Sequence, residues 1–150
     1  MSKKEVALIT GGGTGIGLAV AKKLHSMNKI VVLTGRRKEK LLSAKKKLKS
    51  RCHIIENDIS KLDSIPSLVT EVEKNIGPIN FLINNAGMHL RKIAIETSDQ
   101  EWKDVIDTNL NSVFSLSREC AKKMIRRKNG NIILVGSVTT IMGLPDVTAY

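Results

Sequence analysis

A glycine-rich turn near the N-terminus is the stretch of this sequence best suited to binding a ligand. It reads Thr10-Gly11-Gly12-Gly13-Thr14-Gly15-Ile16-Gly17, with the spacing Gly-x-x-x-Gly-x-Gly. Glycines let the backbone turn tightly and approach a pyrophosphate closely. A helix that begins there offers free N–H groups and a partial positive charge to the phosphates. The turn therefore predicts a nucleotide-binding loop, and the alternative is an ordinary turn between a strand and a helix.

Charged residues follow two later apolar runs. Arg36 and Arg37 come after residues 30–34, where an acidic residue would hold an adenosine ribose hydroxyl. An arginine can instead bind a 2′-phosphate through its planar guanidinium, so we expect NADP as the cofactor, with NAD less favoured. Asp58 follows residues 52–55 and is a candidate partner for an adenine amino group. The alternatives are that Arg36 only begins a basic helix and that Asp58 is a turn residue.

Alternating apolar runs and helical patterns must position these side chains. The runs predict five strands, at residues 6–10, 30–34, 52–55, 79–83 and 131–135. Between them we expect helices over about 15–27, 36–50, 62–75 and 98–129, the third opened by Ser60 or Asp63 and the last by a capping box at Ser98. This alternation predicts one α/β domain over residues 1–150, a doubly wound, Rossmann-type parallel sheet. Ligands bind at the carboxyl ends of the strands in such sheets.

Composition and charge restrict the class of protein. The net charge is +11, but aromatic residues make up only 3% and do not interleave with the lysines, so we regard nucleic-acid binding as unlikely. The sequence contains no long apolar stretch, and we expect no membrane span. Cys52 and Cys120 lack metal-ligand spacing, and no metal site is expected. With strand 1 starting almost at Met1, no signal peptide fits, and we expect a cytoplasmic location.

Several motifs taken together resemble the short-chain dehydrogenase/reductase family. They are the glycine turn, Asp58, Asn84-Asn85-Ala86-Gly87, Asn109, Ser137 and Tyr150, in the family's order and over the whole chain. The resemblance implies a Rossmann fold that binds a nicotinamide cofactor. The candidate cofactor-binding residues are Thr10, Gly11, Gly13, Thr14, Gly15, Ile16, Gly17, Arg36, Arg37, Asp58, Ile59, Asn85, Ala86 and Gly87.

The resemblance also implies a catalytic set. Tyr150 would be the general acid, or the base in the oxidative direction, and Ser137 would hydrogen-bond the substrate oxygen. Asn109 would hold a water molecule in a proton relay. The family's fourth catalytic residue is a lysine four positions after the tyrosine, and the chain as given ends at Tyr150. The later strands and the substrate loop of the family are likewise not in this sequence, which we therefore expect to be a fragment.

The substrate remains open between two branches of the family. The segment Met88-His89-Leu90-Arg91-Lys92 is similar to gluconate 5-dehydrogenases, and Arg91 would suit the carboxylate of a sugar acid. The 131–143 region is equally similar to 3-oxoacyl-carrier-protein reductases, in which Arg126, Arg127 and Lys128 would meet an acidic acyl carrier. The resemblance also implies a homodimer or homotetramer. An alternative of another class is a non-catalytic module that senses NADP or binds nucleic acid.

Overall fold

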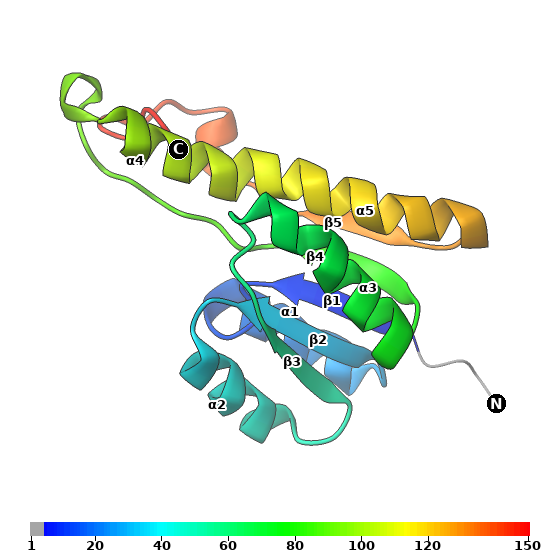
Figure 1. The fold of residues 1–150 in the computed structure, drawn as a ribbon. Helices are drawn as coiled ribbons and strands as arrows, with labels where there is room; N and C mark the ends of the chain where they lie inside the picture. The colour runs from blue at the N-terminus through cyan, green and yellow to red at the C-terminus, as the bar shows by residue number, and fades with distance from the viewer. Residues whose placement is uncertain (1–4) are drawn as a thin grey trace.

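Five parallel strands form the centre of the molecule (Figure 1), in a computed structural model that describes residues 5–150. The residues before Glu5, on which the signal-peptide prediction partly rests, lie outside the described part. The sheet order is β3-β2-β1-β4-β5. The strands are β1 (Val6–Thr10), β2 (Ile30–Gly35), β3 (Cys52–Glu56), β4 (Ile79–Asn84) and β5 (Asn131–Leu134). The five predicted strands are confirmed to within a residue or two at their ends.

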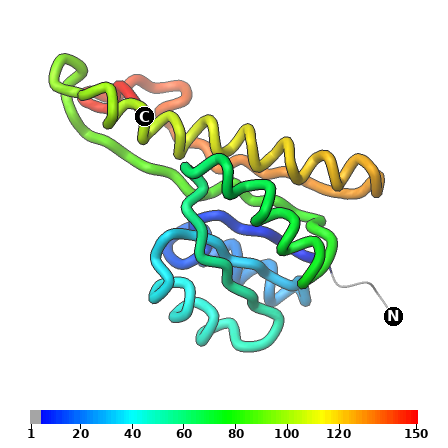
Figure 2. The backbone as a smooth tube through the Cα atoms, in the orientation of Figure 1, coloured from blue at the N-terminus to red at the C-terminus, as the bar shows by residue number. Residues whose placement is uncertain are grey.

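Helices cover both faces of the sheet, which makes it the doubly wound arrangement that the sequence predicts (Figure 1). One face packs against α1 (Gly15–Ser26) and α2 (Lys38–Leu48), and the other against α3 (Ile65–Asn75) and α5 (Ser112–Arg127). The helix α4 (Asp99–Ile106) leads into α5 through a wider π-helical turn at Asp107–Asn111. Figure 2 shows α4 and α5 as one continuous rod along the molecule.

The central strands are buried on both faces, as a continuous apolar run predicts for a parallel sheet. Every residue of β1 is buried, and its side chains alternate between two apolar cores. Val6 and Leu8 pack toward α3 and α5, whereas Ala7 and Ile9 pack toward α1 and α2. On α5, Leu116, Cys120 and Met124 pack into the same core as Val6 and Leu8. The side of α5 that carries these three residues therefore faces the core.

Some local predictions were wrong. Neither Ser60 nor Asp63 caps the third helix: Ser60 instead donates its N–H and its hydroxyl to Asp58 Oδ1. The helix α3 begins after Ser64 and has a proline in its first turn. The sequence of α2 predicts an apolar stripe of Leu41, Leu42, Ala44 and Leu48. Leu42 is instead exposed, because the buried positions follow the spacing 41, 44 and 48. The predicted helix over 98–129 is interrupted by the π-helical turn.

Chain order reverses across the sheet between β1 and β4. From β1 the chain proceeds outward through β2 to β3, and it then returns to β4 and β5 on the other side of β1. This reversal leaves a crevice at the carboxyl ends of β1 and β4, where open α/β sheets bind their ligands. The glycine turn and residues 84–87 both leave the sheet at this crevice. The fold thus brings together the motifs that the sequence singles out.

Candidate nucleotide site and catalytic residues

The glycine turn is shaped by backbone conformations and close approaches that only glycine accommodates. Gly11 and Gly15 have φ values of +63° and +53°, which disfavour a side chain. A Cβ at Gly17 would lie 2.5 Å from the carbonyl oxygen of Gly11 and 2.6 Å from Asn85 Nδ2. A Cβ at Gly13 would lie 3.2 Å from Cβ of Lys40. These contacts draw α1 and α2 close against the turn and leave its outer surface open to a ligand.

Hydrogen bonds from Thr10 and Asn85 join the two sides of the crevice. The buried Thr10 hydroxyl accepts the N–H groups of Asn85 and Ala86, both at 2.9 Å. Asn85 Nδ2 in turn donates to the carbonyl oxygen of Thr10 at 2.9 Å. The sequence suggested Thr10 and Gly17 as cofactor contacts. Both are buried beneath the residues that line the crevice, and they fix its shape.

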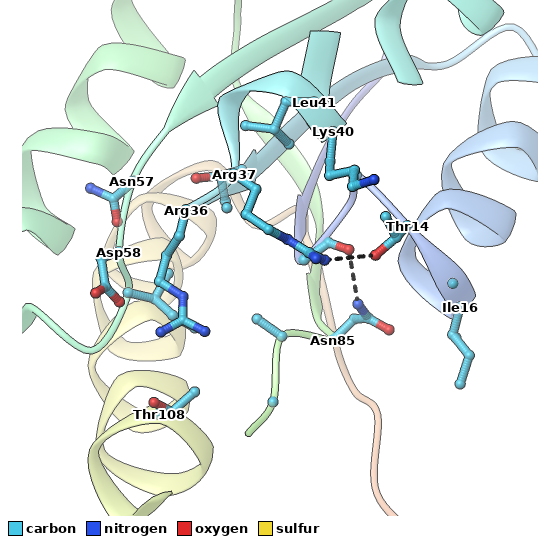
Figure 3. A pocket seen from close by; sticks show the side chains of 18 residues that line it. Thr14, Ile16, Arg36, Arg37, Lys40, Leu41, Asn57, Asp58, Asn85 and Thr108 are labelled. Carbon is cyan, nitrogen blue, oxygen red and sulfur yellow. Dashed lines mark hydrogen bonds between the residues drawn. The ribbon is translucent and has the colours of Figure 1, made fainter. Parts of the chain in front are cut away.

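A cavity of about 470 Å³ occupies the crevice (Figure 3). Twelve of the fourteen predicted cofactor residues line it: Gly11, Gly13, Thr14, Gly15, Ile16, Arg36, Arg37, Asp58, Ile59, Asn85, Ala86 and Gly87. Six further lining residues were not singled out from the sequence: Thr34, Gly35, Lys40, Leu41, Asn57 and Thr108. Most of these six continue motifs already noted, at the end of β2 and beside Asp58. Lys40 lies in the first turn of α2, and its closeness along the chain to Arg36 and Arg37 was the available signal.

Three cations line one side of the cavity, and no carboxylate pairs with them among the described residues. Arg36, Arg37 and Lys40 are exposed, and Arg37 Nη2 lies 3.5 Å from Thr14 Oγ1 (Figure 3). In contrast, Lys38 on the same helix has its Nζ 3.8 Å from a Glu56 carboxylate oxygen. The positive charge at the cavity is therefore available to an anionic ligand.

Thr34 supplies an unsatisfied polar group at the same place. It is fully buried at the end of β2, it lines the cavity, and its Oγ1 has no hydrogen-bond partner within the described part of the chain. Buried hydroxyls are normally hydrogen-bonded, so this atom is suited to a ligand or a bound water.

The candidate catalytic residues lie on the segments that follow β4 and β5. Asn109 sits in the π-helical turn, where its Oδ1 accepts the N–H of Met88 at 2.7 Å and its Nδ2 donates to the Met88 carbonyl at 2.8 Å. The Ser137 hydroxyl accepts the Thr139 N–H at 3.2 Å. The Tyr150 ring meets His89 edge to face, with ring centroids 4.9 Å apart. Asn109 and Tyr150 are thus both in contact with the segment just beyond β4.

Both cysteines are free and buried. Burial raises the pKa of the Cys120 thiol to about 12 and that of Cys52 to about 11, so both thiols are protonated at neutral pH. Among residues 5–150, no three His, Cys, Asp or Glu side chains gather into a group that could hold a metal ion.

None of the helices described is both long and apolar enough to cross a bilayer.

The sequence profile described as short chain dehydrogenase matches residues 5–150. The chain belongs to this family. Nodulation protein G of Rhizobium sp. (strain N33) is 37% identical over 144 residues, covering 96% of this chain and 59% of that protein. A 3-oxoacyl-(acyl-carrier-protein) reductase of Buchnera aphidicola is 36% identical over 98% of this chain and 60% of its own length. The gluconate 5-dehydrogenase of Gluconobacter oxydans is 36% identical, over 96% and 57%.

Solved structures of short-chain dehydrogenases share the fold closely. A metagenomic short-chain oxidoreductase in complex with NADP superposes with a TM-score of 0.93 at 33% identity, over 97% of this chain and 68% of that one. A putative gluconate dehydrogenase from Agrobacterium tumefaciens gives a TM-score of 0.90 at 29% identity, over 97% and 58%. The chain thus spans about three fifths of the length of the curated relatives named above.

The cavity has the features that the family's dinucleotide cofactor requires. Members of the short-chain dehydrogenase family bind NAD or NADP. Gly11, Gly13 and Gly15 leave a concave backbone that a Cβ would fill or strain, which suits a pyrophosphate. Apolar side chains such as Ile59 and Leu41 line the same cavity as Asp58, in the mixture that a nucleoside needs. The residues present therefore fit a nicotinamide dinucleotide.

Proposed function

We propose that this short-chain dehydrogenase is an NADP-dependent oxidoreductase that acts on a carbonyl or secondary alcohol. The observation that carries the choice of NADP is the group of three exposed cations beside the glycine turn. Arg36, Arg37 and Lys40 offer two guanidinium groups and a point charge to a phosphate dianion, and none of the three forms a salt bridge within the described part of the chain. Asp58 is the carboxylate in the lining of this cavity, and it lies beside Arg36 (Figure 3). An NAD-binding site would instead offer a carboxylate at the end of β2 to the ribose hydroxyls.

Three residues of this chain supply the chemistry around the substrate in this proposal. NADPH, when bound, supplies the hydride. Tyr150 donates a proton to the substrate oxygen as negative charge develops there, and it accepts the proton in the oxidative direction. Ser137 donates a hydrogen bond to the same oxygen and holds it in place. Asn109 fixes the backbone of Met88 beside the crevice through its paired hydrogen bonds.

An anionic substrate such as a sugar acid agrees best with the surroundings of Tyr150. Arg91 is exposed and lies two residues after His89, which contacts the Tyr150 ring. Its neighbour Lys92 is engaged by Glu101, so Arg91 is the better candidate of these two cations to meet a substrate carboxylate. Neither side chain lines the nucleotide cavity.

A 3-oxoacyl thioester on an acidic carrier is the alternative substrate. The basic cluster at residues 126–128 suggested this substrate. One of its three charges is not available to a carrier, because Arg127 pairs with Glu73 at 2.8 Å and donates to the Ile79 carbonyl. Arg126 and Lys128 lie at the end of α5 that points away from the C-terminal segment in Figure 1. At about 1.5 Å per residue, the helix places them roughly 24 Å from its first turn. A carrier docked there would be far from Tyr150.

The experiment is a cofactor assay of the full-length protein with a panel of substrates. NADPH oxidation would be followed with keto sugar acids, simple ketones and 3-oxoacyl thioesters, and NADP⁺ reduction with the matching alcohols. We expect turnover with NADP(H) that exceeds turnover with NAD(H), and the highest kcat/KM with sugar acids. Tight NADPH binding without turnover of any substrate would instead favour the non-catalytic module.

A further inference from the structure

The segment Met88–Lys92 lies between two of the candidate catalytic residues. At its start, the backbone of Met88 is fixed by both polar atoms of the Asn109 side chain, at 2.7 and 2.8 Å. The next residue, His89, packs edge to face against Tyr150, with an angle of 63° between the ring planes. The position of this segment therefore bears directly on the position of the Tyr150 ring.

Lys92 attaches the end of this segment to the turn that carries Tyr150. Its backbone N–H donates to the carbonyl oxygen of Asp146 at 2.7 Å, and it forms a parallel bridge with Val147. The Tyr150 N–H in turn donates to the carbonyl oxygen of Val147 at 3.0 Å. The backbone of Lys92 is thus bonded directly to the turn that carries Tyr150.

The side chain of Lys92 attaches the same point to α4. Its ammonium donates to both carboxylate oxygens of Glu101, at 3.0 and 2.9 Å. Glu101 also accepts the backbone N–H of Ser98 and so closes the capping box of α4. Hydrogen bonds from Lys92 and Ser98 lower the pKa of the Glu101 carboxyl to about 2, so the carboxylate stays ionised across the working pH range.

This ion pair is better suited to fixing geometry than to stabilising the fold. Both side chains are about one third exposed, and pairs of that kind contribute little to stability. Within the 146–150 turn that Lys92 holds, Ala149 is buried, whereas Tyr150 is 42% exposed. Because core packing does not enclose the Tyr150 ring, its position depends on the contacts of the turn.

We propose that Lys92 is a positioning residue for Tyr150. Its backbone holds the 146–150 turn, its ammonium anchors that backbone to Glu101 at the start of α4, and His89 on the same segment supports the phenol ring. The inference rests on the proposed function, because the position of Tyr150 matters to catalysis only if this residue transfers the proton. Proton transfer needs its donor within hydrogen-bond reach of the substrate oxygen, and a displacement of about 1 Å is enough to slow it severely.

The test compares three variants of the full-length protein. Lys92→Met removes the ammonium and keeps the stem, Lys92→Arg keeps the charge, and Lys103→Met removes another exposed lysine of the same region that pairs with Asp107 within its own helical stretch. We expect Lys92→Met to lower kcat by about tenfold, with the Kd for NADPH and the KM for the carbonyl substrate within about twofold of wild type. Lys92→Arg should recover most of the rate, and Lys103→Met should retain it.

Amide hydrogen exchange gives a second measurement that does not depend on turnover. Peptides covering residues 143–150 should exchange faster in Lys92→Met than in wild type, and peptides from β1 should not change. Unaltered kcat and unaltered exchange in Lys92→Met would overturn the proposal, as would a loss of kcat that Lys92→Arg or Lys103→Met reproduces in full. Failure of the proposed function looks different, because Tyr150→Phe would then remain active. If no substrate is turned over, the exchange measurement decides alone.

Discussion

In the proposed function, discrimination between NADP and NAD depends on a few side chains at the end of β2 and the start of α2. Gly35 and Arg36 occupy the positions where a carboxylate would bind a ribose hydroxyl and repel a phosphate. Arg37 reaches across to Thr14 on the glycine turn, and Lys40 packs its Cβ near Gly13. The two sides of the cavity therefore both contribute to the place where a 2′-phosphate would sit.

We predict that the full-length protein binds NADPH at least about tenfold tighter than NADH, a difference of roughly 1.4 kcal/mol. Arg36→Ala and Lys40→Ala should each weaken NADPH binding and leave NADH binding nearly unchanged. Each substitution removes a positive charge that would contact the 2′-phosphate, and NADH has no such phosphate. Fluorescence titration measures both affinities. Lys38→Ala is the matched control, since Lys38 faces Glu56 and lies outside the cavity lining. Equal affinities in wild type, or an undiminished preference in Arg36→Ala, would contradict the phosphate assignment.

The two cysteines should be unreactive in the folded protein. Cys52 and Cys120 are 4% and 0% exposed, and burial raises the pKa of their thiols to about 11 and about 12. Below these pKa values the thiolate, which is the reactive form, is scarce. At about pH 8 we expect alkylation of neither thiol until denaturant is added, when both should react. Mass spectrometry would count the adducts, and rapid labelling of the native protein would disprove the burial of these side chains.

At the scale of elements, the contact between α1 and the glycine turn sets the shape of the crevice. A Cβ at Gly17 would lie 2.5 Å from the Gly11 carbonyl oxygen, and backbone cannot move away as a flexible side chain can. We predict that Gly17→Ala costs about 1–3 kcal/mol of unfolding free energy and weakens NADPH binding. Denaturant unfolding and fluorescence titration measure the two effects.

Gly143→Ala is the control for this prediction. Its Cβ would meet no atom within 4 Å, and its φ lies outside the positive range. The unfolding free energy should then change by less than about 0.5 kcal/mol. A Gly17→Ala protein as stable and as tightly bound to NADPH as Gly143→Ala would show that the close approach is not required.

The elements themselves were predictable, because their signals are local. Alternating apolar runs gave all five strands, and Ser98 with Glu101 gave the capping box that the structure contains. The π-helical turn at Asp107–Asn111 was not predicted, since one extra residue in a helical turn leaves no clear periodic signature. The exposure of Leu42 was also missed, because the rotation of α2 is fixed by the sheet on which it packs.

The site was predictable in part, for the same reason. Residues on the glycine turn and at strand ends were recognised, because a parallel sheet gathers its carboxyl ends at one edge. Lys40 was missed, since its place at the cavity depends on how close α2 approaches Gly13. The pairing of Lys92 with Asp146 and Glu101 was missed as well. That pairing joins segments that are brought together by the tertiary structure alone.

Within residues 5–150, β5 and the segment after it present an apolar surface. All four residues of β5 are exposed at the edge of the sheet, and Ile133 and Leu134 have 49% and 62% of their surface accessible. An exposed apolar edge strand can pair with another chain and promotes aggregation.

We therefore predict that residues 1–150 expressed alone are poorly soluble and have no measurable reductase activity. Leu134→Lys should raise the soluble fraction of this polypeptide, because a charge on an edge strand opposes intermolecular pairing. Ser43→Lys adds the same charge on exposed α2 and should raise it less. Light scattering and the soluble yield would measure the difference, and equal effects of the two substitutions would indicate that net charge, and not the β5 edge, controls solubility.

In the proposed function, this short-chain dehydrogenase transfers a hydride with Tyr150 as the proton donor. The most direct test is the turnover of the full-length Tyr150→Phe protein on the best substrate of the panel, measured together with its affinity for NADPH. The substitution removes one hydroxyl and keeps the ring that packs against His89. We predict that turnover is abolished while the Kd for NADPH stays within about twofold of wild type. A Tyr150→Phe protein that keeps a tenth or more of the wild-type rate would contradict it.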